Sequence, residues 1–268
     1  PPNGLDFDLW LGPAPEQAYH GNLVHYNWHW FWDTGNGDTG NQGVHEMDVA
    51  RWAIKGATMP KSVWSIGGRF GYEDQGETPN TQMAVYEYDD ALLLFETRGL
   101  VGKHGIPRVV KNEYYTTEGK ITGGRFYPKN GGKAVGLENF GGEVQPGGPF
   151  GNFVDCVRSR RRDHLNADVL EGHYSSALCH LGNISYRTGQ PEAFDLKSRK
   201  FHDSPTISAG FEALNDNLRG IGMKLEDTQY QVGKQLAFDP ATERFDDEGA
   251  NALLGRPYRK PFVVPEKV

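Results

Sequence analysis

The stretch Met83-Ala-Val-Tyr-Glu-Tyr-Asp-Asp-Ala-Leu-Leu-Leu-Phe-Glu-Thr97 decides the fold class. Its two apolar runs, residues 83–88 and 92–97, have the length and the aromatic and aliphatic content of strands. The polar pair Asp89-Asp90 between them is typical of a tight turn between adjacent antiparallel strands. Similar runs at Val63–Ile66 and Val109–Tyr115 extend the prediction to a sheet of at least four strands.

Helical patterns flank this strand-rich centre. Apolar spacing, capping residues and a following glycine or proline predict helices over residues 44–55, 150–160, 166–189 and 208–225. The pattern as a whole predicts an α+β fold, in which helices cover one face of a large, mostly antiparallel open sheet. We expect a single domain over residues 1–268, with residues 1–20 as an N-terminal arm and residues 238–268 as a surface-wrapping tail. Within the arm, Leu5–Pro15 is expected to form an edge strand or a docking segment.

Charge and hydropathy exclude several classes of partner. The formal net charge is −7, and no basic patch of the kind that binds phosphate backbones occurs, so nucleic acid is not an expected partner. No apolar run approaches the roughly 20 residues that cross a bilayer. We therefore expect a soluble chain with no membrane partner, in either the cytoplasm or the periplasm.

A glycine-rich segment invites a nucleotide-binding interpretation that its context argues against. Gly35–Gly40 satisfies G-x-G-x-x-G and precedes a predicted helix. However, the aromatic residues 30–32 precede it in place of a plain apolar strand, and Asp38 would bring a negative charge to the pyrophosphate. We expect no nucleotide here. The histidines and carboxylates of the chain also lack metal-ligand spacing, so no metal site is predicted.

A histidine that follows this segment is the best candidate for chemistry. His45 begins the predicted helix, and Asn41 and Gln42 lie just before it. Asp48 follows one turn later on the same face. The helix N-terminus disfavours an imidazolium, so a neutral His45 could accept a proton from a substrate hydroxyl. The alternative is a structural histidine that caps the loop or packs against Trp52.

The aromatic stretch His25–Asp33 is a candidate sugar-binding segment. A sugar ring offers apolar C–H faces and polar rims, which aromatic rings and amide or imidazole groups recognise together. In an extended strand, Tyr26, Trp28 and Trp30 would face one way and Asn27 and His29 the other, so one set would be core. The candidate substrate-binding residues are Tyr26, Asn27, His29, Trp30, Gln42 and Asp48.

The stretch Gly40-Asn-Gln-Gly-Val-His-Glu-Met-Asp48 resembles the D-x-G-x-H-x-x-D element of the Gfo/Idh/MocA oxidoreductases, which lies in their C-terminal domain beside the nicotinamide. Further segments resemble one bacterial branch of this family, so that the similarity extends over nearly the whole chain. These segments are Leu5–Pro15, Tyr26–Asp33, Asn152–Arg158, Leu165–Gly189 and Asp239–Pro265.

The resemblance implies a fold, an assembly and an activity. The family domain has an open sheet face that commonly forms dimers or tetramers, so a homo-oligomer through the sheet face is expected. The family transfers hydride between NAD or NADP and a sugar or cyclitol hydroxyl, with a histidine that matches His45 as acid/base or substrate-orienting group. Here Asn41 replaces the family's aspartate and cannot titrate, so a carboxylate relay at that position is lost.

The family's N-terminal Rossmann domain is absent from this sequence, which leaves three hypotheses. In the first, the chain is the substrate-binding and oligomerisation domain of an NAD(P)-dependent sugar oxidoreductase and binds no nucleotide by itself, with a separate Rossmann-domain half as a possible partner. In the second, it is a cofactor-independent hydrolase or lyase that acts on a sugar or lactone, with His45 as the base. In the third, it is a non-catalytic carbohydrate-binding or scaffolding domain.

Overall fold

A computed structural model describes residues 1–268 except 101–108, 142–145, 194–203, 266 and 268. The main sheet has the strand order β11-β10-β1-β2-β3, and β9, which also pairs with β8, joins β1. Every strand pair in it is antiparallel. Its strands are β1 (Ser62–Gly68), β2 (Thr81–Glu87), β3 (Leu92–Arg98), β8 (Gln190–Ala193), β9 (Gln229–Val232), β10 (Leu236–Asp239) and β11 (Arg244–Phe245).

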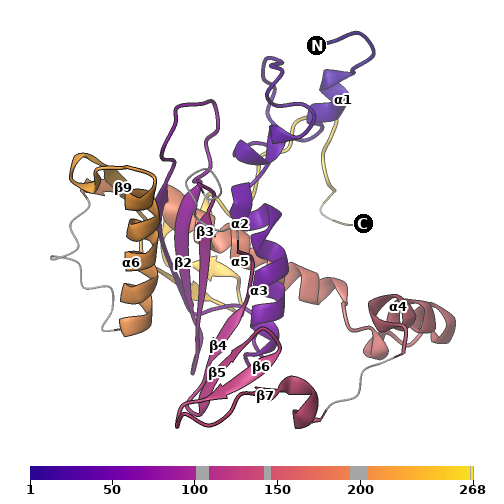
Figure 1. Ribbon diagram of the computed structural model, residues 1–268. Coiled ribbons are helices and arrows are strands. Elements are labelled where there is room, and N and C mark those ends of the chain that lie inside the picture. The colour runs from indigo at the N-terminus through magenta and orange to yellow at the C-terminus, as the bar shows by residue number, and fades with distance from the viewer. Residues whose placement is uncertain (101–108, 142–145, 194–203, 266, 268) are drawn as a thin grey trace.

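Helices surround this sheet and extend away from it at two places (Figure 1). The α-helices are α1 (Phe7–Leu11), α2 (Gly37–Asn41), α3 (Gly43–Trp52), α4 (Gly148–Ser159), α5 (Val169–Arg187), α6 (Pro205–Gly220) and α7 (Glu248–Asn251). Short 3₁₀ helices are η1 (Asn27–Trp30), η2 (Leu137–Phe140), η3 (Arg162–His164) and η4 (Leu225–Asp227).

The β2–β3 hairpin confirms the antiparallel pair predicted from Met83–Thr97. Glu87 pairs with Leu92, and the turn closes with a 2.9 Å hydrogen bond from Tyr88 N to Ala91 O. The mixed α/β class and the large antiparallel sheet are therefore confirmed.

Helices cover both faces of the central strands, whereas the prediction was cover on one face. Ala84 and Tyr86 of β2 pack in a buried cluster with α3 and α5, and Met83 and Val85 pack in a second cluster with α6. Alternate side chains of a strand point to opposite faces, so α5 and α6 lie on opposite sides of β2 (Figure 1). The apolar spacing of residues 208–225 predicted a helix but carried no information on which face it covers.

The predicted fourth strand belongs to a second, smaller sheet. This sheet has the antiparallel order β4-β5-β6-β7, with strands β4 (Glu113–Tyr115), β5 (Gly119–Thr122), β6 (Arg125–Pro128) and β7 (Val135–Gly136). A local turn explains the difference, because the Thr116 hydroxyl accepts hydrogen bonds from the backbone N–H groups of Glu118 and Gly119. This turn pairs β4 with the strand that directly follows it.

A charge cluster stabilises the first hairpin of the small sheet and makes its stability depend on pH. Glu113 accepts hydrogen bonds from Lys111, Tyr115 and Lys120, and these bonds lower the pKa of its carboxyl from 4.5 to about 2. A lowered folded-state pKa adds stability that is fully present above the unfolded value, near 4.5, and is lost as the pH falls toward 2.

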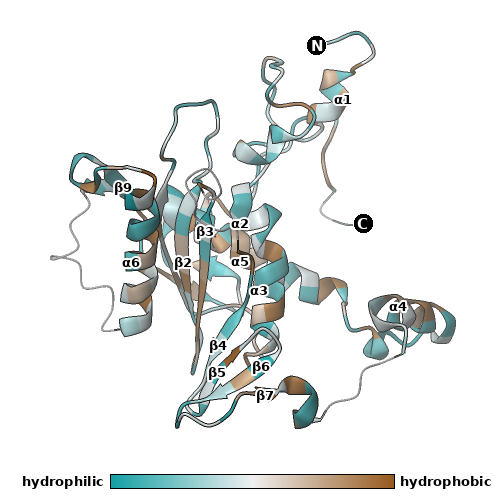
Figure 2. Ribbon diagram, in the orientation of Figure 1, coloured by the Kyte–Doolittle hydropathy of each residue, from teal (hydrophilic) through white to brown (hydrophobic). Residues whose placement is uncertain are grey.

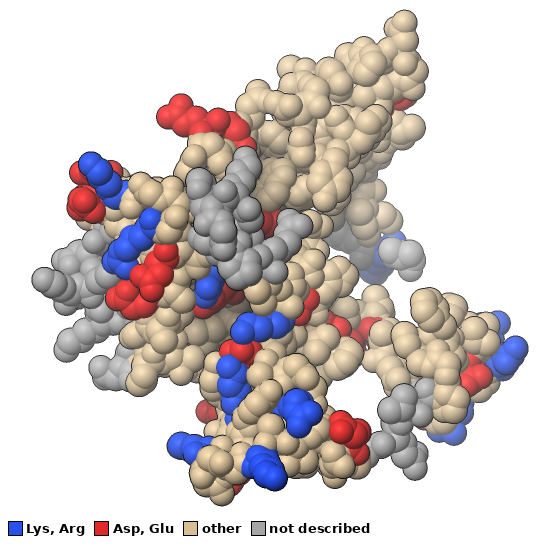
Figure 3. Space-filling view, viewed as in Figure 1, with Lys and Arg blue, Asp and Glu red and all other residues tan. Residues whose placement is uncertain are grey.

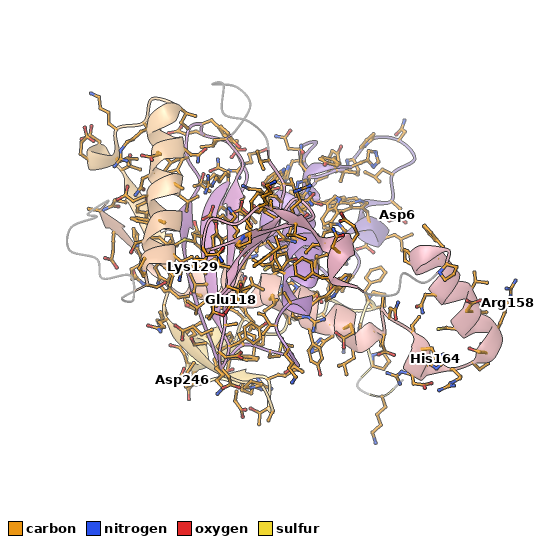
Figure 4. All side chains as sticks on the ribbon, turned by 60° about the horizontal axis from the view of Figure 1, so that its bottom comes forward. Asp6, Glu118, Lys129, Arg158, His164 and Asp246 are labelled. Carbon is orange, nitrogen blue, oxygen red and sulfur yellow. The ribbon has the colours of Figure 1, made fainter. Side chains whose placement is uncertain are left out.

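We therefore expect the β4–β5 hairpin to loosen between pH 4.5 and pH 2. Amide hydrogen exchange of residues 113–122 across this range would report it, and Glu113→Gln should remove the pH dependence. Glu118, which lies in the turn (Figure 4) and is exposed, provides the control, because Glu118→Gln should leave the profile as in the wild type. A profile that is the same in the wild type and in Glu113→Gln would contradict the assignment.

The N-terminal arm contains the short helix α1, so the edge strand, one of its two predicted forms, is wrong. Asp6 caps α1, since its carboxylate accepts a 3.0 Å hydrogen bond from Leu9 N. Such a cap satisfies one of the free N–H groups of the first turn, and Pro13 and Pro15 follow the helix directly. The aromatic stretch likewise forms the 3₁₀ helix η1 in place of a strand. The expected alternation of its side chains between two faces is therefore wrong.

Helix α4 stands away from the body of the protein. Figure 4 shows it with η3, marked by Arg158 and His164, apart from the sheets. Asn152 links α4 to the start of α5, because its amide donates to His164 O (2.8 Å) and accepts from Asn166 N (3.0 Å). Its exposed apolar side chains are Phe150, Phe153, Val154 and Val157, and Figure 2 shows hydrophobic segments along this extension.

The expected C-terminal tail has two parts. Its beginning lies in the main sheet, where Phe238 of β10 pairs with Phe245 of β11 and the two rings are in contact. From Leu236 to Asp239 the residues are alternately buried and exposed, which is the pattern of a strand with one buried face. The residues after α7 return to the N-terminal arm, where Arg259 N donates to Pro13 O. The C-terminal tail therefore lies against the N-terminal arm (Figure 1).

Candidate functional site

The predicted catalytic residues lie on an exposed rim at the junction of α2 and α3. Asn41, Gln42 and His45 are all exposed. The Gln42 amide donates to the Glu46 carboxylate (3.1 Å), whereas the His45 ring has no hydrogen bond within the described part of the chain. An exposed imidazole without a protein partner can still give or take a proton from a ligand.

A buried polar network holds this rim on the sheet. The Thr39 hydroxyl in α2 donates to the Gln82 side-chain oxygen (2.7 Å), and the Gln82 amide donates to Ser65 Oγ (2.9 Å) and Asn183 Oδ1 (3.3 Å). Asn183 in turn donates to Asn36 O (2.8 Å), just before α2. Two of these contacts tie the start of α2 to β2 and α5, and the other two join β2 to β1 and α5, so the network fixes the position from which α3 and His45 start.

Glycine at position 43 allows α3 to lie directly on β3. A Cβ at this position would be 2.7 Å from Cζ of Phe95. Contact that close forces side chains in a packed region to shift and typically costs about 1–3 kcal/mol. We expect Gly43→Ala to lower the free energy of unfolding by about 1 kcal/mol or more, despite the better helix propensity of alanine.

The matched control for this prediction is Gly172 in α5, where a Cβ meets nothing within 4 Å. Gly172→Ala should raise stability by about 0.5–1 kcal/mol through helix propensity and the unfolded state. Urea unfolding of the two variants measures both effects. Equal changes in both would show that Phe95 does not restrict position 43.

The glycine-rich segment does not have the geometry of a phosphate-binding loop. It follows η1, where such a loop follows a strand, and its residues from Gly37 onward form α2 itself. Protein atoms fill the space beside its glycines: a Cβ would lie 2.3 Å from His29 Cα at Gly35, and 2.8 Å from Thr78 at Gly37. The close approach that glycines offer to a dinucleotide is used here for packing. The segment therefore does not fit NAD or NADP.

Asp48 lies in an internal ion network and away from the rim. Its carboxylate accepts a 2.5 Å hydrogen bond from the Ser175 hydroxyl of α5 and lies 3.8 Å from the Arg51 guanidinium. Arg51 is 4% exposed and also pairs with Glu171 (2.5 Å) and donates to Ala57 O (2.7 Å). Asp48, one turn after His45, thus holds α3 against α5.

The aromatic candidates separate into exposed and internal positions. Tyr26 and Asn27 are exposed. His29 is buried and bonds through Nδ1 to Tyr26 O (2.8 Å), so its place is in the core. Trp30 is half-buried beneath the Arg69 guanidinium, which lies 5.4 Å from the ring centroid. Since η1 packs beside α2, the exposed candidates lie near the rim.

A pocket of about 380 Å³ lies where the N-terminal arm meets the C-terminal tail. We call it the arm–tail pocket. Its lining residues are Trp10, Leu11, Pro13, Ala14, Pro15, His25, Trp28, Asp33, Thr34, Arg256 and Tyr258. None of the sequence-predicted site residues is among them. Nothing in the sequence signals that residues near position 10 and position 258 are neighbours, so local patterns could not have revealed it.

Other kinds of site find no support in the described residues. Across them, no group of three or more His, Cys, Asp or Glu side chains is arranged to hold a metal ion. None of the helices in the described ranges combines the length and hydropathy of a bilayer-spanning segment.

Comparison with known proteins finds a family match in the N-terminal part of the chain. Residues 1–96 match the C-terminal alpha/beta domain of the Gfo/Idh/MocA oxidoreductase family. The resemblance to this family is thereby confirmed over residues 1–96. The Gfo/Idh/MocA match includes the rim, η1 and the glycine-rich segment, and it ends within β3.

The structural comparison is more distant. A solved structure from Thermotoga maritima, of a protein provisionally described as an oxidoreductase, is 17% identical over 55% of this chain, with a TM-score of 0.42. The aligned part spans 44% of that chain, which is less than half of its length. No curated protein matches the chain significantly.

Proposed function

We propose that this chain provides the substrate side of a sugar- or cyclitol-directed, NAD(P)-dependent oxidoreductase. The observation that carries the proposal is the exposed His45 ring, without a hydrogen bond among the described residues, on a segment that matches the Gfo/Idh/MocA C-terminal domain. The nicotinamide would be held by a separate Rossmann-type domain or chain, since Gly35–Gly40 does not fit a nucleotide.

In this proposal, His45 accepts the proton from the substrate hydroxyl that is oxidised. Gln42 and Asn41, on the same rim, orient the substrate through their amide groups, which donate and accept hydrogen bonds but cannot titrate. Asn27 begins η1, which packs against α2, and Tyr26 directly precedes it; they would supply a further amide and an aromatic face. The bound nicotinamide would accept the hydride, and the residues of this chain would position the hydroxyl and take its proton.

Two of the residues predicted to bind substrate take no direct part in this proposal. His29 is buried and bonded to the backbone, and Asp48 is engaged with Ser175 and Arg51. We assign both to positioning, because each fixes an element of the rim from behind. Trp30, half-buried beneath Arg69, has the same supporting role.

Assembly is the second part of the proposed function, and the structure favours α4 over the sheet face as its surface. α6 occupies much of the face of β2 and β3 that would otherwise be open. In contrast, α4 exposes an apolar stripe that includes Phe150, which is 83% exposed, and Phe153. A projecting amphipathic helix with an unburied apolar face is typical of a self-association surface.

We expect Phe150→Asp combined with Phe153→Asp to convert an oligomer of this chain to monomers, because two charges would be buried at the contact. Analytical ultracentrifugation measures the change. Leu9→Asp, on the exposed side of α1, is the control and should leave the oligomer intact. A wild-type chain that sediments as a monomer at high concentration would contradict assembly through α4.

The functional test combines the chain with NAD or NADP and a panel of sugars, cyclitols and lactones. The chain alone should bind a sugar or cyclitol but should not reduce the nicotinamide. Adding the Rossmann domain of a Gfo/Idh/MocA enzyme, as a fusion or a separate protein, should produce reduction that depends on His45. Turnover of a sugar or lactone without any nucleotide would favour the hydrolase or lyase hypothesis. Sugar binding that never leads to turnover would favour a non-catalytic domain.

A further inference from the structure

The arm–tail pocket is built by a dedicated set of contacts. Arg259 ties the tail to the arm, because its guanidinium donates to Asp8 Oδ1 (2.5 Å), Asp8 O (3.0 Å), Gly12 O (3.0 Å) and Ala14 O (3.1 Å). Three residues earlier, Arg256 donates to Asp33 O (2.7 Å) and Gly35 O (3.1 Å). Arg259 thus fixes the tail to the arm, and Arg256 fixes the tail to the backbone of Asp33 and Gly35, with six hydrogen bonds that need no ligand.

Aromatic surfaces remain uncovered inside this frame. Trp28 is 42% exposed and Tyr258 is 50% exposed, and both line the pocket together with Trp10. The Trp10 ring is held in place by stacking on Phe7, with ring centroids 5.7 Å apart. The Thr34 hydroxyl donates to Trp28 O (2.7 Å) and fixes the backbone of the second tryptophan. Trp28 and Tyr258 thus keep exposed ring surface at the pocket, whereas Trp10 is partly buried against the hydrophobic cluster of the arm.

Polar groups at the pocket match hydroxyl groups. The Asp33 carboxylate and the His25 ring are exposed lining groups that form no hydrogen bond or ion pair with the described residues. A free carboxylate accepts hydrogen bonds from two neighbouring hydroxyls, and an imidazole can donate or accept one. The guanidinium of Arg256 is already occupied by two carbonyl groups.

We propose that the arm–tail pocket is a binding site for a neutral sugar of one or two rings. Aromatic faces with a polar edge are complementary to a sugar ring, and the volume of about 380 Å³ falls in the range of small-molecule sites. The charged groups that line the pocket are the Asp33 carboxylate and the Arg256 guanidinium, which balance each other and leave no net charge to attract an ionic sugar. Figure 3 shows that the face of the arm turned to the viewer carries almost no charged side chains, in keeping with a neutral ligand.

This site is separate from the rim of the proposed oxidoreductase. Neither His45 nor Asn41 nor Gln42 lines the pocket. The nearest link is η1, which contributes Trp28 to the pocket and packs against α2. The pocket would retain a sugar or a sugar-chain end whether or not the rim catalyses a reaction.

The test is calorimetric titration of the full chain with glucose, galactose, xylose and maltose, beside glucuronate and tetramethylammonium as rival ligands. We expect a neutral sugar to bind with a dissociation constant of roughly 0.1–10 mM. Trp28→Ala and Asp33→Ala should each weaken that binding about tenfold or more. Trp52→Ala, an exposed tryptophan outside the pocket, should bind like the wild type.

Each other outcome overturns the proposal. It fails if no neutral sugar binds, if the lining variants bind as the wild type does, or if glucuronate or tetramethylammonium binds more tightly than every neutral sugar. Weaker binding in His45→Ala with unchanged binding in Asp33→Ala would place the sugar at the rim, which would sink this proposal while supporting the proposed function. Circular dichroism checks folding, and Tyr258→Ala, on the exposed tail, replaces Trp28→Ala if that variant does not fold.

Discussion

His45→Ala is expected to lower kcat/KM for sugar oxidation about 10²- to 10⁴-fold when the chain works with a nucleotide-binding domain. The range is that of a lost general acid/base, because the substrate hydroxyl would have to release its proton to water. KM should change much less than kcat, since the amides of Gln42 and Asn41 remain on the rim. Steady-state kinetics with the best sugar of the panel measures the two parameters separately.

The control for His45 is another exposed histidine far from the rim. His164→Ala, in η3 at the end of the α4 extension (Figure 4), should retain wild-type kinetics. Kinetics in His45→Ala within twofold of the wild type would exclude the acid/base role and leave a structural histidine.

Arg51→Ala is expected to lower the free energy of unfolding by about 3 kcal/mol, the largest stability effect on α3. Its guanidinium is buried between Asp48, Glu171 and the carbonyl of Ala57. Removing this buried side chain leaves a cavity and an unpaired Ala57 carbonyl, and the partly exposed carboxylates of Asp48 and Glu171 lose their counter-charge. Urea denaturation measures the change.

The exposed Arg219 provides the control for Arg51. It pairs with Asp216 on the surface of α6 (2.8 Å), and such pairs contribute little, so Arg219→Ala should change stability by less than about 1 kcal/mol. A comparable loss in both variants would mean that burial of Arg51 contributes nothing specific. Because this network docks α3 on α5, Arg51→Ala should also weaken any sugar that binds beside His45.

The sequence predicted the parts of the fold that depend on local patterns. The hairpin at Asp89-Asp90, the helix after Gly43 and the long helix α5 all follow from residues close in the chain. Errors arose where distant residues decide. The face covered by α6, the separate sheet of β4 and the helical forms of α1 and η1 depend on packing, turns and caps that periodicity does not encode.

For the candidate site too, local sequence patterns gave some features and contacts between distant residues decided the others. Asn41, Gln42 and His45, which the motif spacing grouped, are all exposed at the junction of α2 and α3, and their catalytic roles stay a prediction. The same reasoning placed Asp48 and His29 with the substrate, although long-range contacts to Ser175 and a local bond to Tyr26 O occupy them. The arm–tail pocket joins residues nearly the whole chain apart, so only the folded structure reveals it.

The most direct test of the proposed function is a titration monitored through the histidine ring signals by nuclear magnetic resonance, with His45 assigned from the His45→Gln variant. We predict that one sugar or cyclitol of the panel shifts the His45 signals in a saturable manner and that NAD and NADP leave the chain unchanged. Sugar shifts confined to His25 would report the arm–tail pocket alone. Tight NAD or NADP binding that perturbs Gly35–Gly40, or a His45 ring that no sugar or cyclitol affects, would contradict the account.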